Sequence, residues 1–382
     1  MSAVKIANRL DRFQEYIFAR LEREVANVER ESGRKVLDFG AGDPDVRTSS
    51  LYLDKLCEFI RESDSHFYPG YRALDFKKAV CEWYKKRFDV ELTLDEVVPL
   101  LGAKNGLSLL PLTLADEGDD VLVPDPGYPG FVGPALALGV NPVPYDLLPD
   151  NEFGLSLPAI EKVLTPRTKF IWLNFPSNPT GAVTELDELS EAVSFARDKN
   201  VPIMYDNAYS EITFDGYAAP SILQVSGAKK VAVEIGSFSK TFSFAGLRMG
   251  WAVGNREIIA ALAKVKSQFD SGMSLPLSRL GAFALRNQDT EWHGKMLATY
   301  ESRRNIIASK LKSLGLLFSI PKGALYIWAR IPDSAKDSET FSMEVLRSKH
   351  VLFTPGSAYG KNGERYVRVS ICTNVDKIND YL

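Results

Sequence analysis

Short apolar segments alternate with amphipathic segments between residues 97 and 255 of the chain. The apolar segments are rich in β-branched residues, as buried strands are. They are VVPLL (97–101), DVLVP (120–124), KFIWLN (169–174), PIMYD (202–206), VAVEIGS (231–237) and MGWAVG (249–254). The segments between them have helical periodicity; residues 184–199 are an example, opening with a capping-box pattern from Thr184 to Asp187. This alternation predicts an α/β fold with a mainly parallel sheet between helices.

The pattern changes after about residue 285. A long helical stretch over residues 290–314 precedes further apolar segments near 323–331, 351–354 and 366–371. This order favours a smaller α+β domain, and we expect the N-terminal helix to pack with it because the sheet pattern starts only later. A chain of 382 residues is also long enough for two cores. The predicted parts are an N-terminal segment (1–46), a large domain (47–285) and a small C-terminal domain (286–382).

Composition and charge exclude several classes of partner. The chain is 45% hydrophobic and 25% charged, which is typical of a globular protein. A net charge of −3 gives no basic field, so nucleic acid is not expected as a partner. The N-terminus lacks an apolar core of signal-peptide length, and no later stretch reaches the roughly 18 apolar residues that a membrane span needs. We therefore expect a cytoplasmic protein that does not bind membranes.

Cysteine and histidine offer little chemistry in this sequence. The chain has three of each, and they are scattered: Cys57, Cys81, Cys372, His66, His293 and His350. None of them has the spacing of a metal or redox site. No metal is therefore expected, and the chemistry must use other side chains.

The segment SFSKTFSFAGLR (237–248) places Lys240 at a predicted strand-to-helix junction. A lysine among apolar groups can lose its proton and form a Schiff base with an aldehyde. Ser237, Ser239 and Arg248 would supply donors to a nearby phosphate. Lys240 could equally lie on the surface of a helix, as most lysines do. The segment alone does not decide between these two interpretations.

Polar residues also follow two neighbouring predicted strands. Asp206 ends PIMYD, and the carboxyl ends of parallel strands are where open α/β sheets bind ligands. Its carboxylate could keep a pyridine nitrogen protonated. Tyr209 lies three residues later, and Asn178 lies in the turn segment NFPSNPTG (174–181). Both side chains could then bond the phenolate oxygen of the same ring. The alternatives are a helix cap for Asp206 and a simple turn for Asn178.

Three more segments complete the candidate site. Gly102, Ala103 and Lys104 lie between a predicted strand and a helix, where free backbone N–H groups bind anions. Tyr128, in the turn PDPGYPG, could stack on a flat ring or only pack within its turn. Arg368 alternates with apolar residues in RYVRVSI and is expected to face inward. Its guanidinium then needs an anion, either a substrate carboxylate or an internal ion-pair partner.

Taken together, these motifs resemble those of the class I/II aminotransferases, the fold-type-I pyridoxal-phosphate (PLP) enzymes. The resemblance runs from about residue 8 to the end and rests on the order and spacing of the motifs. They are GDPD (42–45), Tyr68, GAK (102–104), Tyr128, NPTG (178–181), DNAY (206–209), SFSK (237–240), Arg248 and Arg368. Within the family, GAKNG, VLVPDPGYP and KVKSQFDSG look most like the LL-diaminopimelate, alanine and aspartate aminotransferases.

The resemblance implies the PLP-dependent transferase fold type I and a role for each motif. Lys240 would be the Schiff-base lysine, with Asp206 on the pyridine nitrogen and Asn178 and Tyr209 on the phenolate oxygen. The phosphate would be bound by Ala103, Lys104, Ser237, Ser239 and Arg248, and Tyr128 would lie over the ring. Gly42, Asn178 and Arg368 would contact the substrate. Tyr68 would reach the phosphate in a partner subunit, which implies a homodimer with shared active sites.

The implied activity is a ping-pong transfer of an α-amino group between an L-amino acid and a 2-oxo acid, with glutamate and 2-oxoglutarate as one pair. The alternative on the same scaffold is a PLP-dependent carbon–sulfur β-lyase. Arg72, in YPGYRAL, bears on the substrate, because diaminopimelate-specific relatives tend to carry an acidic residue in this segment. A guanidinium there would favour a distal carboxylate and penalise a distal ammonium. Arg72 could instead point to solvent.

Overall fold

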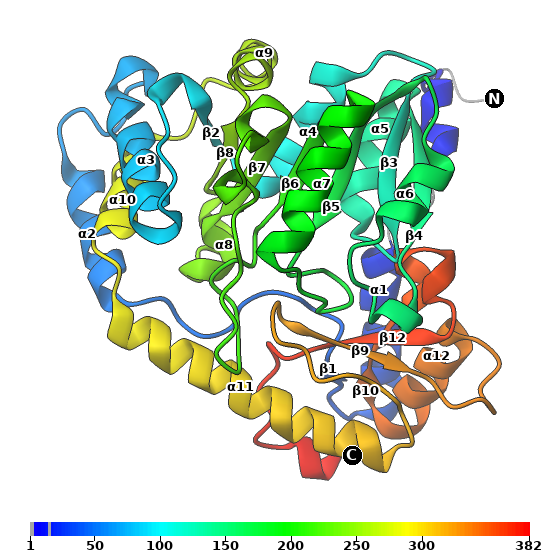
Figure 1. Ribbon diagram of the computed structural model, residues 1–382. Helices are drawn as coiled ribbons and strands as arrows, with labels where there is room; N and C mark the ends of the chain where they lie inside the picture. Colours follow the sequence, from blue (N-terminus) through cyan, green and yellow to red (C-terminus); the bar gives the residue numbers. More distant parts are fainter. Residues whose placement is uncertain (1–3, 14–16) are drawn as a thin grey trace.

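The computed structural model describes residues 4–13 and 17–382, with the backbone alone for Phe18, Tyr71 and Arg72. Its centre is a seven-stranded sheet in the order β2-β8-β7-β6-β5-β3-β4 (Figure 1). The strands are β2 (Val97–Leu100), β3 (Asp120–Asp125), β4 (Asn141–Asp146), β5 (Thr168–Asn174), β6 (Ile203–Asp206), β7 (Ala232–Ser237) and β8 (Gly250–Gly254). Strand β8 runs antiparallel to both of its neighbours, β2 and β7, and the other neighbouring strands of this sheet pair in parallel. The predicted α/β class with a mainly parallel sheet is confirmed.

Strand β4 was not predicted from the sequence. It forms the edge of the sheet and pairs only with β3 among the described residues. Its sequence, NPVPYD, contains Pro142 and Pro144, which cannot donate to a ladder and are tolerated on edge strands. Most of its residues are at least partly exposed, so neither a continuous apolar run nor a clear alternation marks it.

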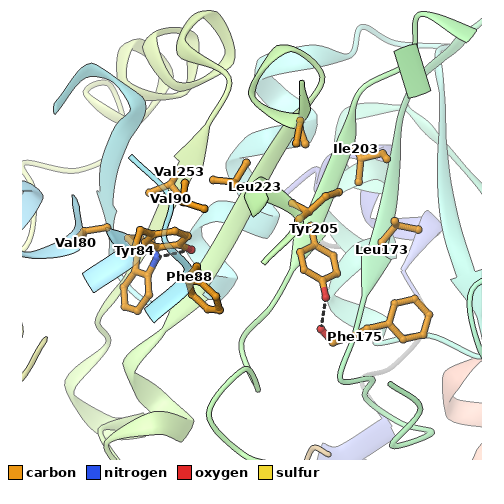
Figure 2. Close-up of a cluster of buried hydrophobic side chains, with 14 of the residues drawn as sticks. Val80, Tyr84, Phe88, Val90, Leu173, Phe175, Ile203, Tyr205, Leu223 and Val253 are labelled. Carbon is orange, nitrogen blue, oxygen red and sulfur yellow. Dashed lines mark hydrogen bonds between the residues drawn. The ribbon is translucent and has the colours of Figure 1, made fainter. Parts of the chain in front are cut away.

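Helices cover both faces of this sheet, because its strands are apolar on both sides. On one face, β5 residues Phe170 and Trp172 share a core with α4 (Ala103–Leu114), α5 (Val132–Leu138) and α9 (Arg256–Lys266). On the other face, Leu173 and Tyr205 pack with further helices, as Figure 2 shows in part. These helices are α2 (Ser50–Arg61), α3 (Leu74–Phe88), α6 (Leu157–Val163), α7 (Leu186–Lys199) and α10 (Leu275–Arg286).

The start of α7 differs from the predicted capping box. The N-cap is Glu185, whose backbone N–H donates to Glu188 at 2.8 Å. The hydroxyl of Thr184 also donates to the Glu188 carboxylate, at 2.8 Å, instead of accepting from the helix. The capping pair is therefore one residue later than the Thr184–Asp187 pair that the pattern indicated.

The C-terminal part begins with the long helix α11 (Thr290–Ser313). An antiparallel sheet in the order β11-β12-β9 follows, built from β9 (Tyr326–Arg330), β11 (Thr354–Pro355) and β12 (Tyr366–Ser370). The chain near its start lies against this part: β1 (Leu37–Asp38) pairs in parallel with β10 (Val351–Leu352). Likewise α1 (Ile17–Ser32) packs on α12 (Ser338–Lys349) through Leu21, Val28 and Leu346 (Figure 1). Across the described residues, no helix is both long and apolar enough to cross a bilayer.

Candidate active site

A cavity of about 600 Å³ opens at the carboxyl ends of the parallel strands. It collects residues from β5, β6 and β7, from the start of α4, and from β9 and β12 of the C-terminal part. The sequence-predicted residues that line it are Gly42, Ala103, Lys104, Tyr128, Asn178, Asp206, Tyr209, Ser237, Ser239, Lys240, Arg248 and Arg368. Motifs separated by more than three hundred residues thus meet around one space.

Lys240 lies in the short helix α8 (Phe238–Thr241), which follows β7 directly. Ser237 begins this helix, because its hydroxyl accepts the backbone N–H of Ser239 at 3.1 Å. The Lys240 ammonium donates to the carbonyl oxygen of Gly42 at 2.8 Å and lies 5.9 Å from the centre of the Tyr209 ring. The amine is therefore half-buried in the cavity, so the surface interpretation of Lys240 does not hold.

Asp206 ends β6 and is 6% exposed. One of its oxygens accepts the backbone N–H of Ala208 at 3.2 Å, as in an Asx turn. Among the residues that the structure describes, no lysine, arginine or histidine forms an ion pair with it. Burial consequently raises the pKa of its carboxyl from 3.8 to about 7. A positively charged group in the cavity would reverse this shift, because it would stabilise the carboxylate.

Asn174 links two predicted motifs and was missed in the sequence. It is the last residue of β5, and its amide nitrogen donates to the backbone oxygen of Asp206 at 2.9 Å. Its side-chain oxygen accepts the backbone N–H of Asn178 at 2.9 Å. This side chain therefore holds the NPTG turn against the end of β6. A polar residue directly after the apolar run of residues 170–173 was the available signal.

Arg368 is 2% exposed and projects from β12. Its guanidinium donates to the side-chain oxygen of Asn178 at 3.0 Å and to the backbone oxygen of Gly40 at 2.6 Å. The guanidinium carbon also lies 4.1 Å from the centre of the Tyr326 ring, which is cation–π geometry. The predicted inward orientation of Arg368 is thus observed, and the group is held from several sides.

Tyr326, the first residue of β9, also lines the cavity and was not predicted. Its hydroxyl lies 3.0 Å from the hydroxyl of Tyr209, and both side chains are buried. Burial raises the pKa of Tyr209 well above its usual value, and the neighbouring Tyr326 hydroxyl raises it further. Because ALYIW reads as an ordinary core strand, this polar contact could not be predicted from the sequence.

The start of α4 forms an anion-binding corner of the cavity. Gly102 precedes this helix with φ of +81°, a conformation that favours glycine. A Cβ atom on Gly102 would stand 2.7 Å from a terminal nitrogen of Arg248, so glycine also lets the guanidinium approach. The backbone N–H groups of Ala103 and Lys104 begin this helix, and the N–H groups at a helix start point toward its N-terminal end, where anions bind. The start of α4 and the Arg248 guanidinium together favour the binding of a phosphate.

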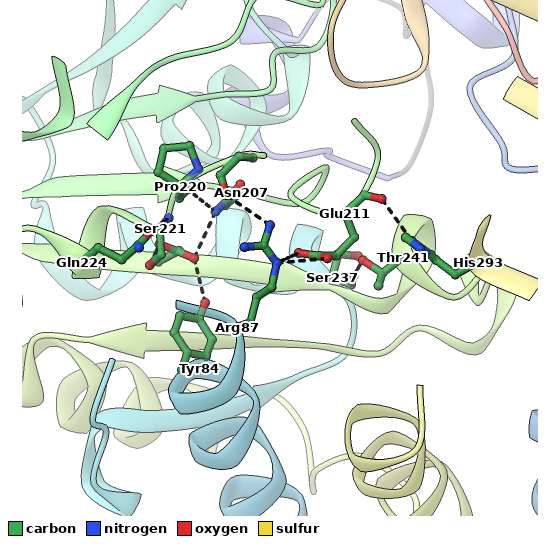
Figure 3. A network of polar contacts seen from close by, with 12 residues as sticks. Tyr84, Arg87, Asn207, Glu211, Pro220, Ser221, Gln224, Ser237, Thr241 and His293 are labelled. Atoms are coloured by element: carbon green, nitrogen blue, oxygen red, sulfur yellow. Dashed lines mark hydrogen bonds and ion pairs between the residues drawn. The ribbon is translucent and has the colours of Figure 1, made fainter. Parts of the chain in front are cut away.

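A buried polar network supports the same strand ends (Figure 3). The Glu234 carboxylate on β7 accepts hydrogen bonds from Tyr84, Ser221, Asn207 and the backbone N–H of Ile222, at 2.8, 2.6, 3.2 and 3.0 Å. Burial raises the pKa of Glu234, while these donors lower it. Since Asn207 follows Asp206 directly, the network fixes the backbone that carries the cavity carboxylate.

Of the other predicted site residues, Gly102 adjoins the cavity through Arg248, and Tyr68 lies elsewhere. Tyr68 is 78% exposed and does not line the cavity of its own chain. Arg72 lies in a short 3-10 helix, Gly70–Ala73, and its side chain is outside the described part of the structure. By contrast, Glu22 and Asp43 line the cavity without having been predicted. The described residues contain no cluster of His, Cys, Asp and Glu that could bind a metal ion.

Comparison with known proteins identifies the family. The family model described as aminotransferase class I and II matches residues 34–382. The chain belongs to this family. It is 37% identical to the LL-diaminopimelate aminotransferase of Halothermothrix orenii over 378 residues, covering 98% of this chain and 96% of that protein. The Moorella thermoacetica enzyme of the same name is 39% identical over 376 residues, covering 98% and 96%.

Solved structures of similar proteins agree with this assignment. Apo-BacF from Bacillus subtilis superposes with a TM-score of 0.93 at 31% identity and covers 99% of this chain and 96% of that one. A probable N-succinyldiaminopimelate aminotransferase from Thermus thermophilus gives a TM-score of 0.87 at 29% identity, covering 95% and 97%. This class I/II aminotransferase therefore has the fold-type-I architecture that the motifs implied.

Class I/II aminotransferases are PLP-dependent enzymes, and so is this one. The cavity fits the cofactor on its own chemistry. Lys240 offers an amine, and Asp206 is a buried carboxylate whose raised pKa calls for a cationic partner. The start of α4 with Arg248 suits a phosphate, and Tyr128 offers an aromatic face. These groups match the aldehyde, ring nitrogen, phosphate and ring of PLP.

Proposed function

We propose that this aminotransferase moves the α-amino group between an L-amino acid and a 2-oxo acid by a ping-pong mechanism, with glutamate and 2-oxoglutarate as one pair. The observation that carries the proposal is that one cavity holds the Lys240 amine, the Asp206 carboxylate and the Arg368 guanidinium. Amino-group transfer on PLP requires three groups: an amine, an anion that pairs with the pyridinium, and a guanidinium that binds the substrate carboxylate.

When bound, PLP supplies an electrophilic carbon and a ring that accepts electrons. Asp206 would keep the ring nitrogen protonated, and Asn178 with Tyr209 would donate to the phenolate oxygen. The phosphate would be held by Arg248, by the backbone of Gly102, Ala103 and Lys104 at the start of α4, and by the hydroxyls of Ser237 and Ser239. Tyr128 would stack on the ring.

The substrate would be held by Arg368 through a charge-assisted pair with its α-carboxylate. Asn178 already accepts from this guanidinium, so it would fix the direction of the fork. The backbone of Gly42 would border the carboxylate, within reach of Lys240. Lys240 Nζ, neutral once released, would take the α-proton of the amino acid and return it to the cofactor carbon as general base and acid.

For the second amino acid, we propose a donor with a distal ammonium, and LL-diaminopimelate is the first to test. Glu22 and Asp43 line the cavity and would attract a second positive charge. Relatives at 37–39% identity carry that substrate in their names. Arg72 makes the opposite prediction, because from a partner subunit it would favour a distal carboxylate. The variants Glu22→Gln and Arg72→Ala, measured side by side, separate the prediction of a distal ammonium from that of a distal carboxylate.

We also propose a homodimer with shared active sites. Tyr68 and Phe269 are exposed aromatic side chains, 78% and 65% accessible. Their segments lie side by side, since a Cβ atom on Gly272 would stand 2.7 Å from Pro69. A second copy would cover these rings and bring Tyr68 to its cavity.

Within each copy, we propose a large domain at 47–285, a small domain at 286–382, and an N-terminal segment at 1–46 that packs with the small domain. The free thiols of Cys57, Cys81 and Cys372 are in keeping with a cytoplasmic location.

The test is a half-reaction screen of the purified holoenzyme with single amino acids. Conversion of the bound cofactor to its amino form, followed spectroscopically, with release of the matching 2-oxo acid, supports the proposal. Glutamate should give 2-oxoglutarate, and LL-diaminopimelate should convert the cofactor faster than alanine. The carbon–sulfur β-lyase alternative is not favoured by the comparisons. Release of pyruvate and ammonia from cystathionine, without loss of the aldehyde cofactor, would support it against transamination.

A further inference from the structure

The cavity contains a pair of buried tyrosine hydroxyls that the proposed roles use only in part. Tyr209 and Tyr326 are 6% and 2% exposed, and their oxygens lie 3.0 Å apart. Within the described chain, each hydroxyl has the other as its hydrogen-bond partner. Tyr209 is the proposed donor to the phenolate oxygen of the cofactor, whereas Tyr326 has no role so far.

The number of protons decides the direction of this contact. A tyrosine hydroxyl has one proton to donate and can accept at its oxygen. If Tyr209 gives its proton to the cofactor, the bond between the tyrosines must be donated by Tyr326. We propose that Tyr326 is a positioning residue: its hydroxyl donates to Tyr209 and thereby aims and strengthens the Tyr209 donor. This inference rests on the proposed function, in which Tyr209 contacts the cofactor.

The fold holds the Tyr326 hydroxyl in place from three directions. Its backbone is fixed by the pairing of Tyr326 with Ser370 between β9 and β12. The Arg368 guanidinium covers its ring at 4.1 Å. Gly42 borders the oxygen so closely that a Cβ atom there would stand 2.3 Å from it. A side chain so confined presents its hydroxyl to Tyr209 and not to solvent.

This arrangement should alter the bound cofactor measurably. A hydroxyl that accepts one hydrogen bond becomes a better donor of the next, because the bonds polarise each other. Stronger donation from Tyr209 withdraws charge from the phenolate oxygen, which then holds the neighbouring proton at Lys240 Nζ less tightly. That proton is consequently lost at lower pH. Removing the Tyr326 hydroxyl should move the pH midpoint of the cofactor's absorption change upward by about 0.5–1 unit.

The experiment uses the holoenzyme of Tyr326→Phe, which keeps the ring under Arg368 and removes only the hydroxyl. The pH midpoint of the bound cofactor's absorption and its dissociation constant are measured beside those of the wild type. We expect the upward shift and PLP binding weakened a few-fold. Tyr145→Phe is the matched control, because its hydroxyl is equally buried and donates to the Trp172 carbonyl oxygen at 2.7 Å, outside the cavity lining. Its midpoint should equal that of the wild type.

A double variant shows whether Tyr326 acts through Tyr209. Tyr209→Phe alone should raise the midpoint, and adding Tyr326→Phe should then change it no further, since coupled residues are not additive. A further shift in the double variant, or an unchanged midpoint in Tyr326→Phe, would overturn the inference. So would an unchanged midpoint in Tyr209→Phe.

Two precautions keep the result decisive. If Tyr326→Phe does not fold, Gly42→Ala displaces the hydroxyl sterically and should give the same upward shift; an unchanged midpoint there overturns the proposal. The proposed function is tested separately by borohydride trapping of PLP on wild-type Lys240. A wild type that traps PLP and transaminates, combined with an unshifted Tyr326→Phe, refutes the inference and leaves the proposed function standing.

Discussion

The buried carboxyl of Asp206 should make the cofactor-free enzyme less stable as the pH rises. Burial raises its pKa from 3.8 to about 7. A shift of roughly three pH units corresponds to about 4 kcal/mol of cost for the charged form in the folded state. Asp206→Asn removes the ionisation and keeps the shape and the acceptor oxygen of the side chain, so it isolates this cost.

The pH window follows from the direction of the shift. Below about pH 4 the carboxyl is protonated in both the folded and the unfolded chain, and it costs nothing. Between about pH 4 and 7 the unfolded chain loses the proton while the folded chain keeps it, so the free energy of unfolding falls. Above pH 7 the full cost applies. The stability of Asp206→Asn relative to wild type should therefore increase by about 4 kcal/mol from pH 4 to 8.

Urea unfolding of both cofactor-free proteins, at several pH values and one fixed protein concentration, measures this difference. Added PLP should reverse the order above pH 7, because a pyridinium stabilises the wild-type carboxylate and not the amide. Asp206→Asn should also lower kcat by about two to four decades, because the buried pyridinium then loses its anionic partner. Parallel stability curves for the two proteins would refute the assigned environment of Asp206. A kcat of Asp206→Asn within tenfold of wild type would refute its role.

Three further outcomes follow from the same site. Lys240→Ala should abolish turnover while PLP still binds weakly through its phosphate; in the wild type, borohydride should fix PLP to Lys240, and mass spectrometry placing it on another lysine would contradict the assignment. Gly102→Ala should weaken PLP binding at least tenfold, since the added Cβ would stand 2.7 Å from the Arg248 guanidinium and strain a φ of +81°; a normal dissociation constant would argue against the phosphate corner. Mixing inactive Lys240→Ala subunits with subunits disrupted at Tyr68 should restore some activity, whereas no rescue under proven subunit exchange would count against shared sites.

The sequence predicted the central sheet because its strands are buried on both faces. In KFIWLN, Phe170 and Trp172 lie on one face and Ile171 and Leu173 on the other, so its four central positions are all apolar. The edge strand β4 was not predicted, because it lacks this pattern and contains two prolines. The segment 351–354 was predicted as one strand, but it is divided between β10 and β11, which pair with different partners.

Some residues of the candidate site could likewise be predicted from the sequence, and others could not. Residues in loops after parallel strands could be predicted, because topology alone brings those ends to one edge. Asp206, Lys240 and Asn178 meet there for this reason. Tyr326 could not be predicted in this way, because it lies in an antiparallel strand of the C-terminal part and resembles a core residue. Its contact with Tyr209 arises only from how the two sheets pack, which local pattern does not encode.

Two buried carboxylates near the same sheet edge, Glu234 and Asp206, have different roles, one structural and one in the site. Glu234 accepts hydrogen bonds from four groups of its own chain, so its carboxylate is satisfied without a ligand. Asp206 lies on the adjacent strand and, among the described residues, accepts from one backbone N–H. A fold selected for stability alone would favour the first arrangement, because each unmet acceptor costs about 1–3 kcal/mol. The poorly satisfied carboxylate is therefore the one expected to meet a cation in the cavity, and the well-satisfied one holds the backbone that aims it.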